Sequence, residues 1–287
     1  MDMQPIADAL PAWMTQQCAD SGRRNSEQLS DDDKLEMCRR GAKLQERVYV
    51  PPEITPNTKC ALCGDYGYRF YWYDGYQFAE ECDCHRAAMN EAEIKRAGVS
   101  EDLTFDNFFT YQPFQQEMMN KAREYAKGGY LSGQWFYIGG QVGAGKTHIC
   151  TAIVHDMIKH IAGCRYMMWK DESTHLKAII NDHAEYGKRM TELTKAPVLY
   201  IDDLFKTQAG VKPTPADVSL AFQIINARYQ DKKYVTLFSC ELSIRNIIEI
   251  DEAVGSRMYE RCKGYNLFIG KDKSKNYRVK DLYEGSS

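Results

Sequence analysis

The sequence predicts an α/β protein in which a domain with a parallel sheet between helices follows a small domain of helix and hairpin. Three observations predict it. A glycine-rich motif joins an apolar strand to a helix at residues 139–147, apolar strand candidates alternate with helical patterns after it, and clustered cysteines flank an aromatic hairpin before it. A chain of 287 residues is long enough for two unequal domains. We expect them to span residues 1–100 and 101–287.

The first fifty residues are polar and mixed. Ser30 to Asp33 predict the start of a helix that carries apolar residues as far as Leu44 and ends before Pro51. It is either a partner-binding segment or a solvated helix packed on its own domain. We find no signal peptide and no apolar run long enough to span a membrane, so we expect a cytoplasmic protein. The net charge of −3 carries no whole-chain signal for nucleic acid.

Two closely spaced cysteine pairs bracket an aromatic segment, residues 66–78. Asp74-Gly75 interrupts this segment with the sequence of a tight hairpin turn, since both central residues of such a turn need positive φ. A hairpin would bring the C-x-x-C and C-x-C pairs together at its open end. The four cysteines concerned are Cys60, Cys63, Cys82 and Cys84.

Four converging thiolates suit tetrahedral Zn²⁺, and the metal would stabilise a hairpin that has little core of its own. All four positions would be filled, so the site is expected to be structural. His85 is an alternative ligand to Cys84, and buried cysteines without metal are the other interpretation. In a reducing compartment, the ten cysteines of the chain are better explained as thiols and metal ligands than as disulfides.

Two helices and a linker lead from the hairpin to the glycine-rich motif. Residues 86–96 predict a charged helix that stops at Gly98, and residues 104–109 form an aromatic linker. A second helix is expected from Pro113 to Ala126, before two glycines.

The glycine-rich motif fits the pattern G-x-x-x-x-G-K-[ST] between a short apolar strand, residues 135–138, and a helix-forming stretch, residues 147–160. Its glycines let successive N–H groups point inward, and the helix N-terminus adds partial positive charge for phosphates. Lys146 is expected at the β- and γ-phosphates of a nucleotide and the Thr147 hydroxyl on Mg²⁺. A glycine-rich turn with a chance Lys-Thr is the alternative. The loop residues expected to bind nucleotide are Gly140, Gly143, Ala144, Gly145, Lys146 and Thr147.

Apolar strand candidates then alternate with helical patterns, which predicts a parallel sheet with helices on both faces. The candidates are residues 165–170, 198–201, 235–240 and 265–269. The second ends in Asp202-Asp203, at the sheet edge where α/β proteins bind ligands. We expect Asp202 to hold the Mg²⁺ shell and Asp203 to orient or deprotonate the attacking water. Alternatively, Asp203 caps the following turn.

Arg257 and Arg261 are spaced i, i+4 and so share one face of a helix. Arg257 is a candidate for stabilising the γ-phosphate on a neighbouring subunit, with an ordinary surface arginine as the alternative. The segment 257–280 holds eight basic residues against two acidic ones, with Tyr265, Phe268 and Tyr277 interleaved. It is either a surface for single-stranded nucleic acid or a solvated loop. Arg278 is also a candidate nucleotide contact.

These motifs together resemble the DnaC/IstB-like AAA+ ATPases, and within them the zinc-bearing helicase loaders similar to DnaI, of bacterial or phage origin. The resemblance covers residues 60–280. It rests on the cysteine hairpin and on the stretches Phe105-Asp106-Asn107-Phe108, Gly140-x4-Gly145-Lys146-Thr147-His148, Tyr200-Ile201-Asp202-Asp203-Leu204, Ile225-x2-Arg228-Tyr229, Ser256-Arg257 and Asn276-Tyr277-Arg278.

The resemblance implies an AAA+ P-loop ATPase that self-assembles and binds ATP with Mg²⁺. Its N-terminal domain would dock on a hexameric replicative DNA helicase, and its AAA+ domain would bind single-stranded DNA. By position, His148 joins the nucleotide-binding residues, Arg257 corresponds to the arginine finger and Arg278 to the second nucleotide sensor. Family members often carry a polar Ser/Thr-Asn after the fourth strand, where this chain has Ser239-Cys240-Glu241. The first sensor is therefore open between Ser239 and Glu241, although an ionised glutamate cannot donate as asparagine does.

Three classes of protein remain in competition. The cysteine hairpin ahead of the ATPase favours a helicase loader. A transposition helper of the IstB type shares the ATPase core and would not be expected to need the hairpin. A P-loop kinase is the third class. It would ordinarily bring a substrate pocket and an arginine-bearing lid, whereas Asp203 and a candidate arginine from a neighbouring subunit suit hydrolysis.

Overall fold

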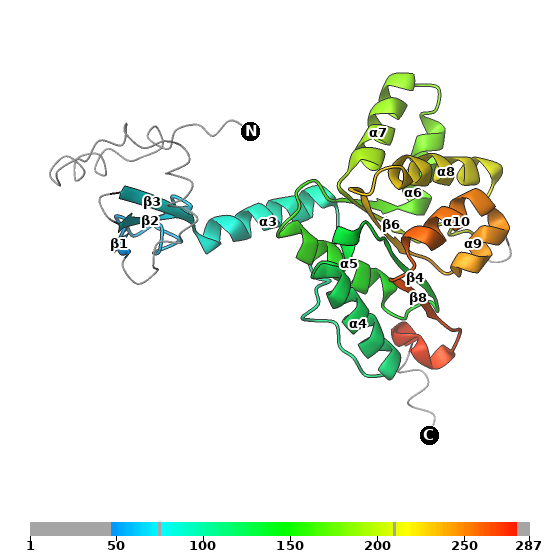
Figure 1. The fold of residues 1–287 in the computed structure, drawn as a ribbon, viewed down its shortest axis with the longest axis horizontal. Helices are drawn as coiled ribbons and strands as arrows, with labels where there is room; N and C mark the ends of the chain where they lie inside the picture. Colours follow the sequence, from blue (N-terminus) through cyan, green and yellow to red (C-terminus); the bar gives the residue numbers. More distant parts are fainter. Residues whose placement is uncertain (1–46, 74–75, 209–210, 280–287) are drawn as a thin grey trace. The chain divides into compact units, whose positions relative to one another are not determined.

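The computed structural model describes residues 47–73, 76–208 and 211–279 (Figure 1). They divide into two compact units between Met89 and Asn90, within helix α3 (Asp83–Ala97). The domain boundary expected near residue 100 stays a prediction, and the helix expected to open at Ser30 lies outside the described residues. Helix α3 extends the predicted span 86–96 in both directions and ends at Gly98, whose φ is +80°.

The first unit carries a three-stranded antiparallel sheet in the order β1-β2-β3. The predicted hairpin is confirmed: β2 (Tyr68–Tyr73) and β3 (Tyr76–Glu81) pair in a register that joins Tyr73 to Tyr76 across the turn. Strand β1 (Val48–Val50) was not expected and pairs with residues 70–72 of β2. Its β-branched and aromatic residues suit a strand.

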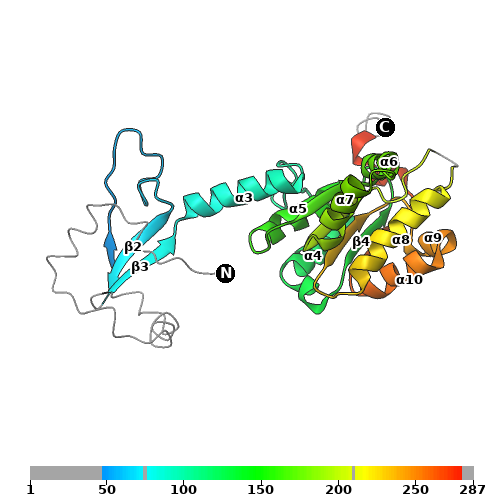
Figure 2. The ribbon, with the colours of Figure 1, turned by 90° about the horizontal axis from the view of Figure 1, so that it is seen from above.

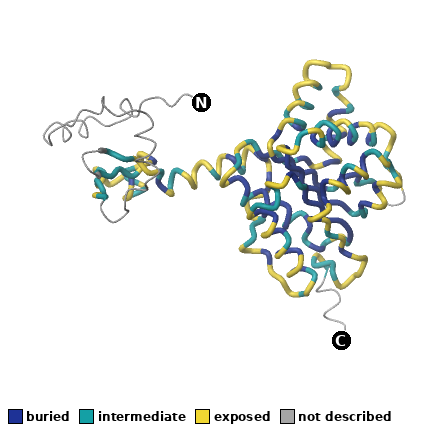
Figure 3. The backbone as a smooth tube through the Cα atoms, in the orientation of Figure 1, coloured by how far each residue is buried: buried dark blue, intermediate teal, exposed yellow. Residues whose placement is uncertain are grey.

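The second unit is built on a five-stranded parallel sheet in the order β5-β6-β7-β4-β8, which confirms the predicted fold class. All five predicted strands form, with small differences at their ends. Figure 2 shows the sheet of this unit between its helices. The central strands β4, β6 and β7 are buried along their whole length, in the dark blue centre of this unit in Figure 3, whereas β5 and β8 at the sheet edges are partly exposed. The strands are β4 (Phe136–Gly140), β5 (Arg165–Met168), β6 (Val198–Asp202), β7 (Val235–Ser239) and β8 (Asn266–Ile269).

Helices cover both faces of this sheet and divide its core in two. On one face α4 (Pro113–Ala126) and α5 (Lys146–Ile158) pack against Phe136, Ile138 and Tyr200. The other face carries the remaining helices, which pack against Trp135, Leu199 and Phe238. They are α6 (Trp169–Ala178), α7 (His183–Lys195), α8 (Pro215–Tyr229), α9 (Ile244–Ile250) and α10 (Glu252–Arg261). Among the described residues, every helix is too short or too polar to cross a lipid bilayer.

A buried arginine ties α7, α8 and β7 together. The Arg228 guanidinium donates to Thr236 Oγ1 at 2.9 Å and to the carbonyls of Leu193, Ala196 and Val235 at 2.9, 2.7 and 2.6 Å. It also reaches the carbonyl of Thr194. Because these carbonyls lie where α7 ends and β7 begins, Arg228 satisfies backbone groups that no helix or strand would pair.

The register of the central strands brings three strand ends together at one edge of the sheet. Ile138 of β4 pairs with Ser239 of β7, and Ile201 of β6 pairs with Phe238, which also belongs to β7. The carboxyl ends of three neighbouring parallel strands therefore meet, which brings Gly140, Asp202 and Ser239 to one side of the sheet.

Candidate functional site

The glycine-rich motif forms a loop between β4 and α5, as expected. Lys146 is buried, and its Nζ donates to the carbonyl oxygens of Gly140 at 2.9 Å and Gln141 at 2.7 Å. Burial lowers the pKa of Lys146, while the nearby Asp203 carboxylate acts in the opposite direction. Gly145 has φ +88°, and a Cβ there would come within 2.7 Å of the Phe108 ring, so only glycine fits.

Asp202 sits beneath the loop in a cage of hydroxyl groups and is only 3% exposed. Its carboxylate accepts hydrogen bonds from Thr147 Oγ1 at 3.2 Å, from the Tyr166 hydroxyl at 3.1 Å and from Ser239 Oγ. A carboxylate beside the threonine of a phosphate loop is the oxygen donor set that Mg²⁺ takes in such proteins. The residues present therefore fit a magnesium ion held by Thr147 and Asp202.

Tyr166 is a member of this cage that the sequence reasoning missed. It lies on β5, which neighbours β6 in the sheet, and burial together with the Asp202 carboxylate raises the pKa of its hydroxyl. The hydroxyl therefore stays protonated and donates to Asp202. Nothing in the local sequence distinguishes this tyrosine from the others, because its role depends on the order of the strands.

A cavity of about 320 Å³ opens beside the loop and collects residues from distant parts of the second unit. Asp203 lines it and has φ +55°, a left-handed conformation that aspartate tolerates better than most residues. The turn after β6 is closed by the backbone, because the N–H of Lys206 donates to the Asp203 carbonyl at 2.9 Å. The lining residues are Leu103, Val142, Gly143, Gly145, Lys146, Thr147, His148, Asp203, Lys206, Glu241 and Arg278.

The two candidates for the first sensor lie in different places. Ser239 is fully buried at the end of β7, where its hydroxyl contacts Asp202, accepts from the Asp203 N–H at 3.3 Å and meets the Tyr200 hydroxyl at 3.2 Å. Glu241 lines the cavity and forms an ion pair with Lys206. Ser239 therefore contacts both aspartates through one hydroxyl, whereas Glu241 adds negative charge on the side where phosphates would sit. Lys206 was not foreseen from the sequence.

The aromatic linker packs on the loop helix through His148. The Nε2 atom of His148 lies 2.8 Å from the Thr104 carbonyl and 3.0 Å from Asn107 Oδ1, so it must carry the proton. The ring meets Phe108 edge to face at 5.0 Å. Burial lowers the pKa of His148, against the opposing effect of the hydrogen bond to Thr104. These contacts explain physically why the linker and the Lys-Thr-His sequence occur together.

The segment that follows β8 contacts the same loop. Two short 3₁₀ helices, η5 (Lys273–Lys275) and η6 (Tyr277–Val279), follow β8. The N–H of Tyr277 donates to the Gly143 carbonyl at 3.0 Å, and Arg278 lines the cavity. Tyr277 thus contacts the phosphate loop and Arg278 lies at the cavity beside it, while a nucleotide contact by Arg278 stays a prediction.

Arg257 lies apart from this cavity. It stacks between Phe222 and Tyr229, with its guanidinium carbon 5.3 and 5.5 Å from the ring centres, and it donates to the Ala253 carbonyl at 2.7 Å. It does not line the cavity beside the phosphate loop, and its role as an arginine finger stays a prediction.

The structure corrects two members of the predicted basic patch. Arg261 is buried and donates to the carbonyls of Gly133 and Tyr229, and Tyr265 is buried against α4. The i, i+4 spacing showed that Arg257 and Arg261 share a face, yet it could not show how far that face turns toward the core. Neither Arg261 nor Tyr265 can therefore bind nucleic acid from the surface.

The second candidate site is the cysteine cluster in the first unit. The Sγ atoms of the four predicted cysteines all lie within 4.8 Å of one another, with Cys60 3.8 Å from Cys82 and Cys63 3.3 Å from Cys84. Tetrahedral zinc with Zn–S bonds of about 2.3 Å places its sulfurs about 3.8 Å apart, so the cysteines fit a zinc ion.

Neighbouring residues hold the cysteine cluster in shape. Asp65 accepts hydrogen bonds from the N–H groups of Lys59 and Cys60, and the Tyr49 hydroxyl of β1 donates to the Leu62 carbonyl. His85, the alternative ligand, lies outside the cluster and pairs with Glu81 at 2.9 Å. The geometry therefore favours the all-cysteine set.

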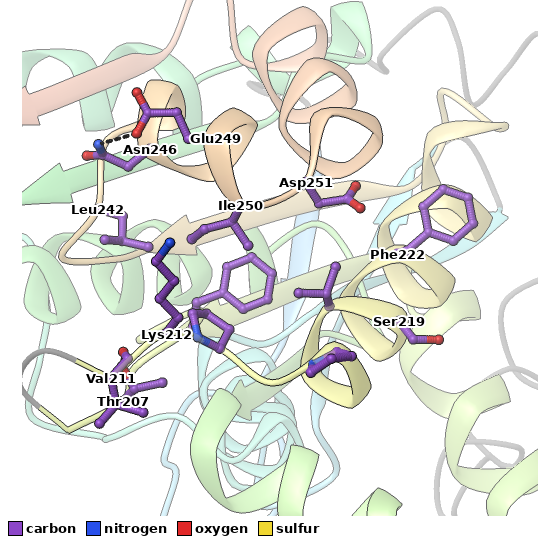
Figure 4. A pocket seen from close by; sticks show the side chains of 14 residues that line it. Thr207, Val211, Lys212, Ser219, Phe222, Leu242, Asn246, Glu249, Ile250 and Asp251 are labelled. Carbon is purple, nitrogen blue, oxygen red and sulfur yellow. Dashed lines mark hydrogen bonds between the residues drawn. The ribbon is translucent and has the colours of Figure 1, made fainter.

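A larger cavity, of about 880 Å³, lies between α8, α9 and the segment that follows β6 (Figure 4). None of the predicted site residues lines it. Phe222 belongs to its wall and also packs against Arg257, so this cavity and the candidate finger occupy neighbouring positions on the same helical face.

The parallel sheet and the loop between β4 and α5 define a P-loop nucleotide-binding protein. Residues 132–262 match the family model described as IstB-like ATP binding protein. The uncharacterized protein YqaM of Bacillus subtilis (strain 168) is 33% identical over 224 residues, which cover 73% of this chain and 69% of YqaM. The phage-like element PBSX protein XkdC of the same organism is 29% identical over 242 residues, covering 79% and 86% of the two chains. The chain belongs to the IstB/DnaC-like family of AAA+ ATPases.

Among solved structures, a DNA replication initiation factor superposes with a TM-score of 0.51 at 13% sequence identity. The match covers 65% of this chain and 54% of that factor, so the chain spans about half of the factor's length. At this identity the likeness concerns the fold of the ATPase unit alone.

Proposed function

We propose that the protein is an ATP-dependent loader of a hexameric replicative DNA helicase, which binds and hydrolyses ATP and contacts single-stranded DNA. The observation that carries the proposal is the pairing, in one chain, of a four-cysteine unit with an ATP site of the IstB/DnaC-like family. Among the described residues of the first unit, Cys63 and Cys82 are the buried hydrophobic ones, so a metal on the four cysteines would stabilise a unit that has little other core. We assign helicase docking to the surface of this unit.

At the ATP site, each residue has a role that follows from its position. Lys146 exchanges its two carbonyl partners for the β- and γ-phosphates, to which it offers a full charge. Thr147 and Asp202 would hold Mg²⁺, which would supply positive charge to neutralise the phosphates. Asp203 orients the attacking water, or takes its proton, from the cavity wall. Ser239 links the two aspartates and serves as the first sensor, and Arg278 serves as the second.

Hydrolysis depends on assembly in this proposal, because Arg257 reaches only the nucleotide of a neighbouring copy. ATPase activity per chain should therefore rise with protein concentration. Arg257→Ala should abolish that rise and spare ATP binding, since Arg257 does not line its own cavity. Arg245→Ala, which removes an exposed arginine of α9, is the matched control. A concentration-dependent rate that survives in Arg257→Ala would remove the finger role.

The cysteine unit is the proposed helicase-docking surface, held in shape by one zinc ion. Its residues belong to the N-terminal domain, which we propose to end near residue 100. The division of the chain into two compact units supports this assignment, because a docking surface on the first unit would be separate from the ATP site on the second. Cys63→Ser should therefore abolish helicase binding while leaving ATP binding in the other unit intact.

A transposition helper of the IstB type is the second candidate, favoured by the description of the matching family model. The two candidates differ in partner rather than in ATP chemistry. A P-loop kinase is the weakest of the three, because the family to which the chain belongs is one of ATPases.

The decisive experiment measures binding of the purified protein to the replicative helicase of its own host, together with ATPase activity with and without helicase and single-stranded DNA. A loader should bind the helicase and respond to both. Binding to a transposase in place of the helicase would support the helper, and a phosphorylated acceptor would support the kinase. Cys63→Ser and Lys146→Ala separate the docking and ATP contributions.

A further inference from the structure

Three aromatic side chains lie in a row at the surface of the second unit, beside the phosphate loop. Phe109 is the last residue of the aromatic linker, Tyr111 lies between the linker and α4, and Tyr277 belongs to η6. The ring centres of Phe109 and Tyr111 are 6.2 Å apart, and those of Tyr111 and Tyr277 are 5.6 Å apart with only 19° between their planes. Phe109 is 63% and Tyr111 64% exposed, so this aromatic row presents large ring surfaces to solvent.

Two hydrogen bonds fix the segments that carry the aromatic row. The N–H of Tyr111 donates to Gln115 Oε1 at 2.8 Å, which fixes the linker to the first turn of α4. Gln112 Nε2 donates to the Ser274 carbonyl at 3.3 Å and joins the linker to the segment that carries Tyr277. Exposed aromatic rings held on ordered backbone lose little conformational entropy when a ligand stacks on them.

The segment that carries Tyr277 is basic. Residues 271–279 contain three lysines and one arginine against one aspartate. Lys271 and Lys273 are exposed, and Lys275 lies over the Phe114 ring at 5.6 Å. The aspartate, Asp272, accepts from the N–H of Ser274 at 2.9 Å and from its hydroxyl, so its carboxylate is engaged within the segment.

We propose that the aromatic row stacks on the bases of single-stranded DNA while the lysines beside it contact the phosphates. Single strands offer flat base faces and negative charges at short intervals, whereas a duplex hides its base faces within the stack. The inference rests on the proposed function, to which it adds the DNA-contacting residues. It replaces the buried Tyr265 of the sequence-based patch with Phe109 and Tyr111, which lie far away in the sequence.

The base of bound ATP is the competing occupant, and binding of an ATP analogue distinguishes it from DNA. None of the three aromatic residues lines the 320 Å³ cavity that contains the loop residues, Asp203 and Arg278. The aromatic row nevertheless shares a contact with that site, because the N–H of Tyr277 donates to the Gly143 carbonyl of the phosphate loop. DNA on the aromatic row and ATP in the cavity therefore meet the same loop from two sides. Their affinities should be coupled, and the coupling should be reciprocal.

The test measures the affinity of the full chain for a fluorescent oligothymidylate by anisotropy, with Phe109→Leu and Tyr111→Leu as variants. Leucine keeps an apolar side chain and removes the ring. Stacking on one ring contributes about 1–3 kcal/mol per base, so each variant should raise the Kd by about fivefold to a hundredfold. Tyr259→Leu, which removes a ring of 52% exposure on α10, is the matched control and should bind as the unaltered protein does. Binding of a fluorescent ATP analogue should be unchanged in all three.

Each outcome decides something. An unaltered protein that does not bind oligothymidylate overturns the DNA contact in the proposed function, and the aromatic row with it. An unaltered protein that binds, with Phe109→Leu and Tyr111→Leu binding equally well, overturns the aromatic row alone. Loss of ATP-analogue binding with unchanged DNA affinity would assign the rings to the nucleotide base. An equal loss of affinity for duplex DNA would show that the rings do not stack on bases. A photocross-link from iododeoxyuridine in the oligonucleotide to Phe109 or Tyr111 would support the aromatic row directly.

Discussion

The variant Lys146→Met distinguishes two roles of the Lys146 ammonium group: pairing the loop carbonyls and binding the phosphates of ATP. In the structure, the ammonium donates to two loop carbonyls, at 2.9 and 2.7 Å. Such charge-assisted bonds contribute about 1.5–3 kcal/mol each. Burial opposes them, because it removes the charge from water and lowers the pKa of Lys146. Methionine removes this desolvation cost together with the two bonds, one of which is only partly buried, so the two effects largely offset each other. We therefore expect the free energy of unfolding to change by no more than about 1 kcal/mol.

The effect on ATP should be much larger. Truncating one partner of a buried charge pair costs about 2–5 kcal/mol, which corresponds to at least about 30-fold weaker binding. Calorimetric titration with a non-hydrolysable ATP analogue measures the affinity, and urea unfolding measures the stability. Lys212→Met, which removes an exposed lysine outside the ATP site, is the control and should change neither.

Two results would refute this reasoning. A Kd within about threefold of the unaltered protein would show that Lys146 does not contact the phosphates. A loss of several kcal/mol in stability would show that its main role is to hold the loop together. The predicted combination, a stable protein that no longer binds ATP, distinguishes a phosphate ligand from a structural cation.

Three further predictions concern stability and metal. Arg228→Met leaves several buried carbonyls without a donor. It should lower the free energy of unfolding, measured by urea denaturation, by about 2–4 kcal/mol. A change below about 1 kcal/mol would contradict the hydrogen bonds described for Arg228. Burial sets the pKa of His148 in the folded protein below its value of about 6.5 in the unfolded chain. Between these two pKa values the unfolded chain binds more protons than the folded protein does. The free energy of unfolding therefore falls as the pH drops from about 6.5 to the folded pKa. His148→Gln should lose less stability than the unaltered protein between pH 7.5 and 5.5, whereas parallel pH curves would exclude the effect. Elemental analysis should find about one zinc per chain, lost in Cys63→Ser and retained in Cys164→Ser, and metal-free protein with an intact first unit would refute the site.

The parts of the fold that could be predicted from the sequence are those encoded locally. The glycine-rich loop, the hairpin and helix α4 each carry their start and stop signals within a few residues, and the apolar strands are short buried runs between helical patterns. The elements β4 and α5 could be placed on either side of the loop because the motif itself demands that order. Strand β1 was missed, since three residues next to two prolines are too few to distinguish a strand from the end of a helix.

The less predictable parts of the candidate site depend on which elements become neighbours. Tyr166 reaches Asp202 only because β5 lies beside β6, and Lys206 meets Glu241 only because the turns after β6 and β7 adjoin. Arg261 was wrongly assigned to the surface, because helical spacing gives relative faces and not burial. The aromatic row likewise combines side chains from both ends of the second unit, and no local pattern joins them.

The contact between Tyr277 and Gly143 has a consequence for how the protein is made. The phosphate loop lies near the middle of the chain, whereas β8, which pairs with β4, and Arg278, which lines the cavity, are synthesised more than a hundred residues later. A nascent chain that stops before residue 278 carries the loop without the partners that complete its surroundings, and β4 without its neighbour on one side. Synthesis thus completes the surroundings of the phosphate loop only after β8 and residue 278 have emerged.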